Sequence, residues 1–294
     1  MLLQSGAIMR QFATFFVVIS VLFVLGCGGR TTPATQPTPS AFDPALSDAK
    51  SLAAVDGMDK VLGGLELWAQ VKQIRWEQKY YLDGALKSWT KNAWDMWNQR
   101  IRFDMADMST YKESEPDKTQ FYTAMYDIFH HDGDSGSAMY ANHVLGRDEQ
   151  RKVIKTAWEH FDAQVYMVVL PYKVKDPGVK LEYDGERSAT PVGNDLTVCD
   201  PVCDVIKVSF VPEVGKDTYW LDINRNTKMP DIVEKRNERG RLAYALSDWT
   251  EVKGLKFPKK LQNVGLTTEK FELDDFEISD PEDELYIPQV RSAN

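Results

Sequence analysis

Apolar and polar residues alternate along several segments of this chain, and the alternation limits the folds that it can adopt. In residues 74–80, Ile74 and Trp76 alternate with Arg75 and Glu77. The same pattern recurs in residues 100–105, 206–210, 219–224 and 271–278. A period of two places the apolar side chains on one face of a β-strand. In the last segment the pattern slips by one residue at Asp274-Asp275, which predicts a β-bulge. The sequence therefore predicts a mainly β body built on an antiparallel sheet.

Two segments show a helical pattern instead. Residues 44–70 carry apolar positions interrupted at Gly57 and Gly63-Gly64, which predicts one broken helix or two short ones. In residues 147–161 one apolar stripe is expected, formed by Val153, Ile154, Ala157, Trp158 and Phe161. A sheet with two apolar-faced helices must bury them, and the concave face of a curved sheet is the expected place.

The N-terminus has the parts of a secretory signal. Arg10 precedes an uncharged apolar run of 14 residues, from Phe12 to Leu25, and Gly26 precedes Cys27. The run is shorter than the roughly 20 residues of a membrane-spanning helix. Gly26-Cys27 resembles the bacterial lipobox, which implies cleavage before Cys27 and acyl chains that attach it to a membrane. Since Gly28 rather than Asp follows, the resemblance favours the outer membrane, with the domain facing the periplasm. The alternative is an ordinary secretory signal with an incidental cysteine.

Composition divides the rest of the chain. We expect a signal at 1–26, a lipidated cysteine and disordered Thr/Pro/Ser tether at 27–46, one domain at 47–288 and a flexible tail at 289–294. Arg10 is the only charged residue of the signal, so 34 basic residues remain against 44 acidic ones, a charge of about −10. Nucleic acid is therefore not an expected partner. No cofactor is indicated.

Cys199 and Cys203 remain once Cys27 is lipidated, and an oxidising periplasm would join them in a disulfide. A redox-active pair and half of a metal site are the alternatives. The spacing is not Cys-x-x-Cys, and no second Cys/His pair with zinc spacing accompanies it.

Residues 130–137 contain a Gly-Asp-Ser-Gly sequence that resembles a protease nucleophile motif. No His-bearing motif of the required type precedes it, and neither a hydrolase elbow nor a calcium loop fits the spacing. A polar hairpin tip between residues 121–129 and 138–144 is the preferred interpretation, with a weak metal site as the alternative. His130, His131, His143 and His160 are expected on the surface or in loops. We therefore expect neither a catalytic residue nor a metal ion.

The eight tryptophans all lie between Trp68 and Trp249. They are expected mainly in the core, and a curved open sheet would also let some of them line a ligand site.

Several short sequence segments together resemble those of one protein family. They are Gly63-Gly64 with Trp68 and Val71, Trp94-Asp95, Arg100-Ile101-Arg102, Leu170-Pro171-Tyr172-Lys173, Asp176-Pro177-Gly178, Tyr219-Trp220-Leu221-Asp222, and Trp249 with Val252, Gly254-Leu255 and Pro258. Over residues 50–280 the chain is similar to envelope proteins of the outer-membrane lipoprotein-sorting class, the LolA, LolB and LppX type.

That resemblance implies an unclosed antiparallel half-barrel whose helices cover an apolar concavity that accepts acyl chains. The expected function is binding of a lipid or other amphiphile by a non-enzymatic, membrane-anchored protein. Such binding would serve lipid or lipoprotein trafficking. Val153, Ile154, Trp158 and Phe161 are the candidate cavity residues. A structural or assembly lipoprotein with a self-filled cavity is the second hypothesis, and an unrecognised hydrolase is the third.

Overall fold

The computed structural model describes residues 42–128, 136–161, 166–212, 217–237 and 240–288. Cys27, the signal, most of the tether and the 289–294 tail lie outside these residues. The helices are η1 (Pro44–Leu46), α2 (Ala49–Leu62), α3 (Leu65–Trp68), η2 (Pro116–Lys118), α4 (Arg147–His160), α5 (Tyr166–Lys173) and η4 (Asp283–Tyr286). The strands are β1 (Gln73–Leu82), β2 (Ala85–Asp95), β3 (Arg100–Ala106), β4 (Phe121–Asp127), β5 (Ser137–Tyr140), β6 (His143–Val144), β7 (Val179–Val192), β8 (Leu196–Phe210), β9 (Thr218–Asn224), β10 (Pro230–Asn237), β11 (Gly240–Val252), β12 (Leu255–Asn263) and β13 (Glu269–Ser279).

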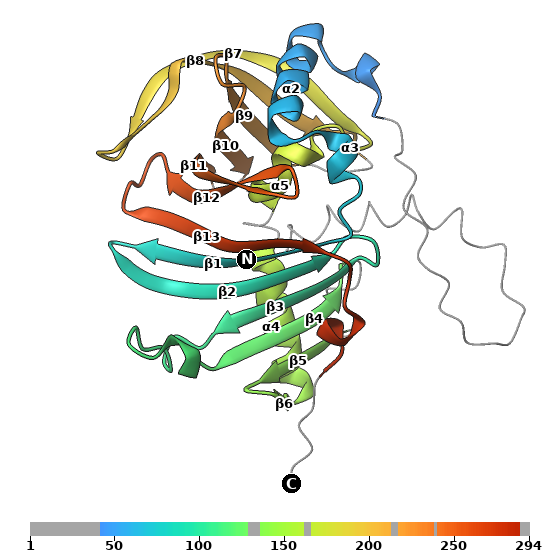
Figure 1. Ribbon diagram of the computed structural model, residues 1–294, viewed down its shortest axis with the longest axis vertical. Coiled ribbons are helices and arrows are strands. Elements are labelled where there is room, and N and C mark those ends of the chain that lie inside the picture. Colours follow the sequence, from blue (N-terminus) through green and yellow to red (C-terminus); the bar gives the residue numbers. More distant parts are fainter. Residues whose placement is uncertain (1–41, 129–135, 162–165, 213–216, 238–239, 289–294) are drawn as a thin grey trace, which may run out of the picture.

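All thirteen strands belong to one antiparallel sheet in the order β6-β5-β4-β3-β2-β1-β13-β12-β11-β10-β9-β8-β7. The first and last strands pair at its centre, and on each side of this pair the chain runs as a meander. The sheet is curved, and it does not close because β6 and β7 end the order without pairing with each other. The predicted fold class, a curved and unclosed antiparallel sheet, is confirmed (Figure 1).

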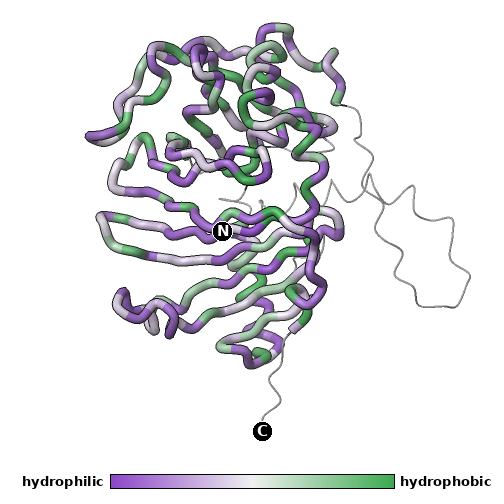
Figure 2. Tube along the Cα trace, in the orientation of Figure 1, coloured by the Kyte–Doolittle hydropathy of each residue, from purple (hydrophilic) through white to green (hydrophobic). Residues whose placement is uncertain are grey.

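The predicted alternation sets which residues face the core. Ile74 pairs with Trp94, Trp94 with Ile101 and Ile101 with Tyr126, so one row of large side chains crosses four strands on the concave face. Figure 2 shows hydrophobic and hydrophilic positions interspersed along the strands, and they alternate regularly in the β3 sequence, Arg-Ile-Arg-Phe-Asp-Met. The predicted bulge is also confirmed, because the β1–β13 register shifts next to Asp275, whose φ is 55°.

Three helices occupy the concave side, not the two that the sequence predicts. α2 contacts β7, β9 and β12, and α4 contacts β4 and β5, while α5 contacts β10 and α2 between them. α5 was missed because its sequence, Tyr-Met-Val-Val-Leu-Pro-Tyr-Lys, is apolar almost all round and shows no amphipathic stripe. Such a run cannot be assigned to a helix or a strand from its pattern.

The predicted break at Gly63-Gly64 is present, but the one at Gly57 is not. α2 runs unbroken through Gly57 and ends at Gly63, which adopts the left-handed conformation with φ 113°. A glycine inside a helix is tolerated at a cost of about 1 kcal/mol, so its presence does not interrupt the helix. None of the helices in the described ranges is long and apolar enough to cross a membrane.

The N-terminal end of the described chain is fixed to the sheet edge. Pro44–Leu46 form the short helix η1 at the end of the predicted tether. Asp48 caps α2 by accepting from Lys50 N (3.0 Å) and Ser51 N (2.8 Å). Its second carboxylate oxygen accepts from Tyr183 N of β7 at 2.6 Å. The globular part therefore begins at the outer edge of β7.

A second, smaller apolar cluster lies on the outer face of the sheet. Ile232 belongs to it, whereas the adjacent Val233 belongs to the main core, and neighbours on a strand point to opposite faces. The end of the β7–β8 hairpin supplies Val192, Val198, Cys199 and Cys203 to this cluster. The hairpin therefore folds back over the outside of β10 and β11.

Candidate functional site

The four residues predicted to line a cavity lie together on the inner face of α4. Val153, Ile154, Trp158 and Phe161 are exposed by 8%, 0%, 4% and 5% and belong to the main core. α4 makes its main contacts with β4 and β5, near the end of the sheet. In this structure the four side chains therefore pack on the sheet.

Aromatic rings connect α4 to the sheet. The Phe161 ring meets Trp94 of β2 edge-on, with 5.4 Å between centroids, and stacks with Trp158 at 5.9 Å. Trp158 in turn meets Tyr126 of β4 at 6.4 Å. His160 stacks on Phe103 of β3 at 5.9 Å. These contacts make the concave face of β2, β3 and β4 an aromatic surface covered by α4.

Polar atoms without hydrogen-bond partners are buried in this aromatic surface and beside it on β1. Among the described residues, the indole Nε1 of Trp76 and Trp94, the hydroxyl of Tyr126 and the Oδ1 of Asn92 have none. Trp76 pairs across the strands with Asn92, and Trp94 lies on the same face two residues further along β2. Burial alone raises the pKa of Tyr126, so its hydroxyl is a neutral donor at any physiological pH. The site thus offers three donors and one acceptor within an apolar environment.

The other half of the concavity is filled by α5. Met167, Val168 and Leu170 are each no more than 2% exposed. The Tyr172 hydroxyl accepts from Lys256 N at 2.9 Å and lies 3.1 Å from Leu62 O, and its ring stacks on Trp68 at 4.6 Å. This half is a packed core, with the tryptophan and tyrosine as structural residues.

Two surface depressions flank α3. One, of about 440 Å³, is lined by Asp59, Gly63–Leu67, Gln70 and Lys175, and the other, of about 210 Å³, lies between Leu67, Lys72, Lys253 and Asp280. Neither extends between α4 and the sheet, because their lining residues include none from α4, β2, β3 or β4.

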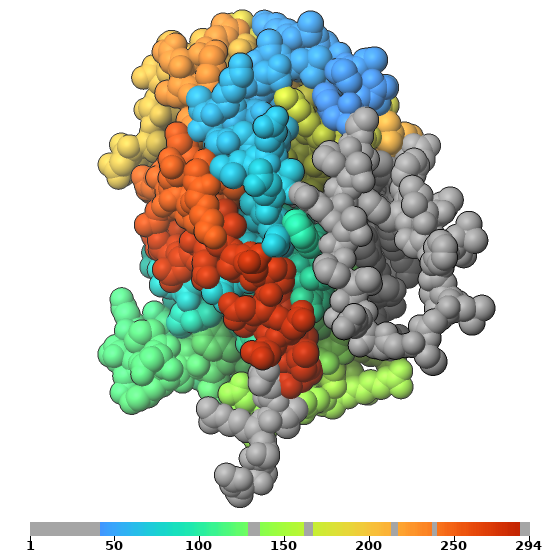
Figure 3. Space-filling view, turned by 45° about the vertical axis from the view of Figure 1, so that its right-hand side comes forward, coloured from blue at the N-terminus to red at the C-terminus, as the bar shows by residue number. Residues whose placement is uncertain are grey.

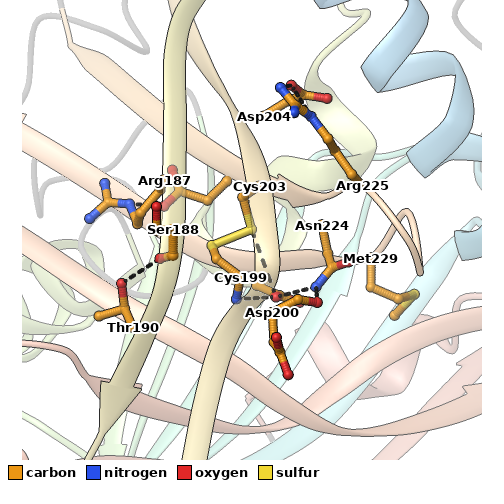
Figure 4. Close-up of a disulfide and its surroundings, with 12 residues drawn as sticks. Arg187, Ser188, Thr190, Cys199, Asp200, Cys203, Asp204, Asn224, Arg225 and Met229 are labelled. Carbon is orange, nitrogen blue, oxygen red and sulfur yellow. Dashed lines mark hydrogen bonds and ion pairs between the residues drawn. A yellow bond between two sulfur atoms is a disulfide. The ribbon is translucent and has the colours of Figure 1, made fainter.

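The predicted disulfide between Cys199 and Cys203 is confirmed. Both cysteines lie within strand β8, where Cys199 has a φ of 56°, and both are completely buried in the outer cluster. Asp231 of β10 accepts from Cys199 N at 2.6 Å and from Asn224 Nδ2 at 2.9 Å. Figure 4 shows the bond within the hairpin, next to Asn224 at the end of β9.

Ligand atoms of Cys199, Cys203 and Asp231 lie within 4.8 Å of one another, which is close enough to hold a metal ion. However, sulfurs that are bonded to each other are not the thiolates that coordinate metals. The group therefore acts as a structural link that fastens the β7–β8 hairpin to β10.

A buried charge cluster lies on the same outer face. Asp222 of β9 and Glu234 of β10 are both fully buried. Arg187 of β7 forms ion pairs with both, and Arg241 binds Glu234 at 2.8 Å. Burial raises the pKa of Asp222 to about 7, with Glu234 adding to the shift and Arg187 opposing it. The cluster joins the hairpin to the sheet by charge, as the hydrogen bond from Cys199 N to Asp231 joins it to β10.

The chain is similar to known proteins in structure rather than in sequence. No protein-family model matches the chain, and no curated protein matches its sequence. Two similar structures, both with a TM-score of 0.42 and covering 81% of this chain and 97% of their own, are a LolA superfamily protein from Nitrosomonas europaea (12% identical) and a DUF1329 family protein from Desulfovibrio piger (5% identical). A domain assigned to outer membrane lipoprotein sorting, from Vibrio parahaemolyticus, gives 0.39 at 11% identity over 80% of this chain and 96% of its own. The names of the first and third neighbours are of the LolA and lipoprotein-sorting type that the sequence resembles.

The Gly-Asp-Ser-Gly segment is flanked by the predicted hairpin. β4 and β5 pair from Tyr122–Tyr140 to Met125–Ser137, which confirms the flanking strands. His130, His131 and the 133–135 part of the motif lie outside the described residues. Of the other histidines, His143 is exposed on β6 and His160 is half-buried at the end of α4.

Sequence reasoning missed the unpartnered donors and the charge cluster. The alternation in residues 74–80 and 100–105 placed Trp76 and Phe103 on the buried face, but the positions of Asn92 and Tyr126 beside them depend on the register of β2 and β4. Asp222 and Glu234 occupy outward positions of alternating strands, which normally face water. Only the folded-back hairpin buries them, and no local signal marks that fold.

Proposed function

We propose that this protein is a membrane-anchored envelope lipoprotein that binds a lipid or other amphiphile between α4 and the concave face of β2, β3 and β4. Cys27 would carry the acyl chains, with the half-barrel facing the periplasm from the outer membrane. The protein would act by binding and releasing its ligand, without catalysis.

The unpartnered polar atoms on the concave face carry this proposal. A buried donor or acceptor that lacks a hydrogen bond costs about 1–3 kcal/mol, so natural cores seldom retain several together. Here Trp76, Trp94, Tyr126 and Asn92 hold four such atoms on one face. A ligand with an ester or carboxyl group would satisfy the donors while its acyl chain contacts the surrounding rings.

The position of α4 allows such a ligand to enter. α4 packs on β4 and β5, at the end of the sheet, and its side-chain hydrogen bonds to neighbouring segments include those of Gln150 with Ala138 N (3.3 Å) and Leu145 O (2.7 Å). Its apolar stripe can separate from the sheet if a ligand chain replaces it. Burying that chain would then contribute about 25 cal/mol for each Å² of apolar surface removed from water.

A specific observation favours the second hypothesis, a structural lipoprotein with a self-filled cavity. α5 fills the other half of the concavity with its own side chains, and neither surface depression enters the interior. In that case α4 would be a permanent part of the core.

Titration with a fluorescent fatty acid separates the two functions. The amphiphile proposal predicts that the wild type binds the probe and that Trp158→Ala weakens the binding. The free energy of unfolding should fall by less than the about 3–5 kcal/mol typical of emptying an aromatic core site, because α4 can separate without unfolding the sheet.

Leu170→Ala in α5 is the matched control. It should lower the free energy of unfolding by about 2–5 kcal/mol and leave the affinity for the probe unchanged. If the wild type does not bind the probe and Trp158→Ala shows the full stability loss, the self-filled structural protein is correct instead.

A further inference from the structure

The C-terminal strap, residues 280–287, crosses the outer face of the sheet after β13 ends. In Figure 3 it forms a band on the molecular surface below β13. Its helix η4 contacts β3, and Lys72 holds its first residue, Asp280, at 2.6 Å. The strap is not a strand of the described sheet, so side chains rather than a ladder of backbone bonds hold it in place.

Three arginines form the surface under the strap. Arg75 of β1 and Arg102 of β3 both pair with Ala93 of β2, so they lie in one row on either side of a small residue, and Arg100 lies two positions from Arg102. Each arginine binds a carboxylate of the sheet: Arg75 binds Glu277, Arg100 binds Asp95 at 2.7 Å, and Arg102 binds Asp104 at 2.9 Å. The sheet therefore fixes the direction of all three guanidinium groups.

Each of the same arginines also binds the strap. Arg75 lies 3.8 Å from Glu282, Arg100 lies 2.7 Å from Asp283, and Arg102 donates to the Leu285 carbonyl at 3.2 Å. Because their sheet partners hold them, the arginines would keep their orientation if the strap left. Donors that are already oriented lose little side-chain entropy when an acidic segment binds.

Tyr286 has a site of its own in this surface. Its hydroxyl donates to Gln73 Oε1 at 2.7 Å, and the Arg100 guanidinium lies 4.6 Å from its ring centre. Gln73 is completely buried and donates its amide to Ser279 Oγ at 2.9 Å, which leaves Oε1 facing the tyrosine. The surface therefore recognises a tyrosine together with the acids that precede it.

The contact has the chemistry of a reversible one. The Asp280, Glu282 and Asp283 side chains are 80%, 57% and 79% exposed, and ion pairs so exposed stabilise weakly. The floor under the strap includes the buried polar side chains of Gln73 and Asp95, with which water can form hydrogen bonds once the strap leaves. The three arginines form a local basic group on a chain whose formal net charge is −9.

We propose that this arginine surface is a docking site for an acidic, tyrosine-bearing segment of a partner protein, and that the strap occupies it in the free protein. A partner segment binds by displacing the strap and taking over its contacts with Arg75, Arg100, Arg102 and Gln73. This proposal is independent of amphiphile binding, because the arginines lie on the face opposite to α4.

The test uses the full chain and a fluorescently labelled synthetic peptide with the sequence of residues 280–288. Tyr286→Ala should release the strap and bind the peptide about tenfold more tightly than the wild type, since occupancy by the strap lowers the apparent affinity of a competitor. Ile287→Ala is the matched control, because Ile287 is 54% exposed and should leave the affinity at the wild-type value.

Two further measurements locate the site. Arg102→Gln added to Tyr286→Ala should weaken peptide binding, and so should a peptide with amides in place of Glu282 and Asp283. Asp283→Asn provides a milder release of the strap if Tyr286→Ala fails to fold. The proposal is overturned if the folded releasing variants bind no more tightly than the wild type, or if the neutral peptide binds as well as the acidic one.

Discussion

At the scale of single residues, the carboxyl group of Asp222 connects burial to pH. Its pKa is raised to about 7 in the folded chain, mainly by desolvation, against about 3.9 when it is unfolded. Between these values the folded state holds a proton that the unfolded state has released. The contribution of this residue to stability is therefore greatest below about pH 4 and declines as the pH rises to about 7.

Replacing Asp222 by Asn should flatten that decline, because the amide does not ionise. We expect the free energy of unfolding of the wild type to fall between pH 5 and 7, by up to a few kcal/mol. That of Asp222→Asn should fall less over the same range. Urea titrations at several pH values provide the measurement.

Asp204→Asn is the control for this experiment. The pKa of Asp204 is lowered, because its bonds to Arg225 outweigh its desolvation, so its removal should leave the decline above pH 5 in place. An Asp222→Asn variant with the same pH dependence as the wild type would show that the buried carboxyl is not the cause.

At the scale of elements, the Gly63-Gly64 turn between α2 and α3 sets how closely the helices approach the β11–β12 turn. Both glycines have positive φ, at 113° and 95°. A Cβ at Gly63 would lie 2.1 Å from Gly254 O, whereas a Cβ at Gly64 would meet nothing within 4 Å.

Gly63→Ala should therefore cost more stability than Gly64→Ala. Both variants place a Cβ at a positive φ that favours glycine, which costs about 1–3 kcal/mol each. Gly63→Ala must also move the helix away from a backbone atom, which should add at least about 1 kcal/mol. Equal melting temperatures for the two variants would contradict this close approach.

Periodic patterns made some elements predictable and left others undetected. β1, β3 and α4 have one mainly buried face, and their sequences show it directly. α5 is buried on all sides and the strap lies on a surface of arginines, so neither has the apolar stripe that reveals an element.

The candidate site was predictable only in part, for a related reason. Val153, Ile154, Trp158 and Phe161 follow from the helical stripe of one segment. The polar residues on the same concave face, among them Trp76 and Asn92, come together through the register of strands that a single sequence does not specify.

At the scale of the whole molecule, the proposed attachment to a membrane depends on Cys27. Intact-mass analysis of the protein from the membrane fraction should give a chain that begins at Cys27 and carries a diacylglyceryl group. Cys27→Ser should release the protein from the membrane, because the expected acyl chains supply the attachment. A different mature start, or a Cys27→Ser protein that stays attached, would contradict the anchor.

The central claim is that the half-barrel holds an amphiphile, and non-denaturing mass spectrometry of the envelope-purified protein tests it most directly. Acyl chains on Cys27 would be covalent and would remain after denaturation, whereas a ligand under α4 would be lost. We predict an additional mass that disappears on denaturation and is reduced in Trp158→Ala but not in Leu170→Ala. Identical masses for the protein before and after denaturation, with no binding of added fatty acid, would contradict the account.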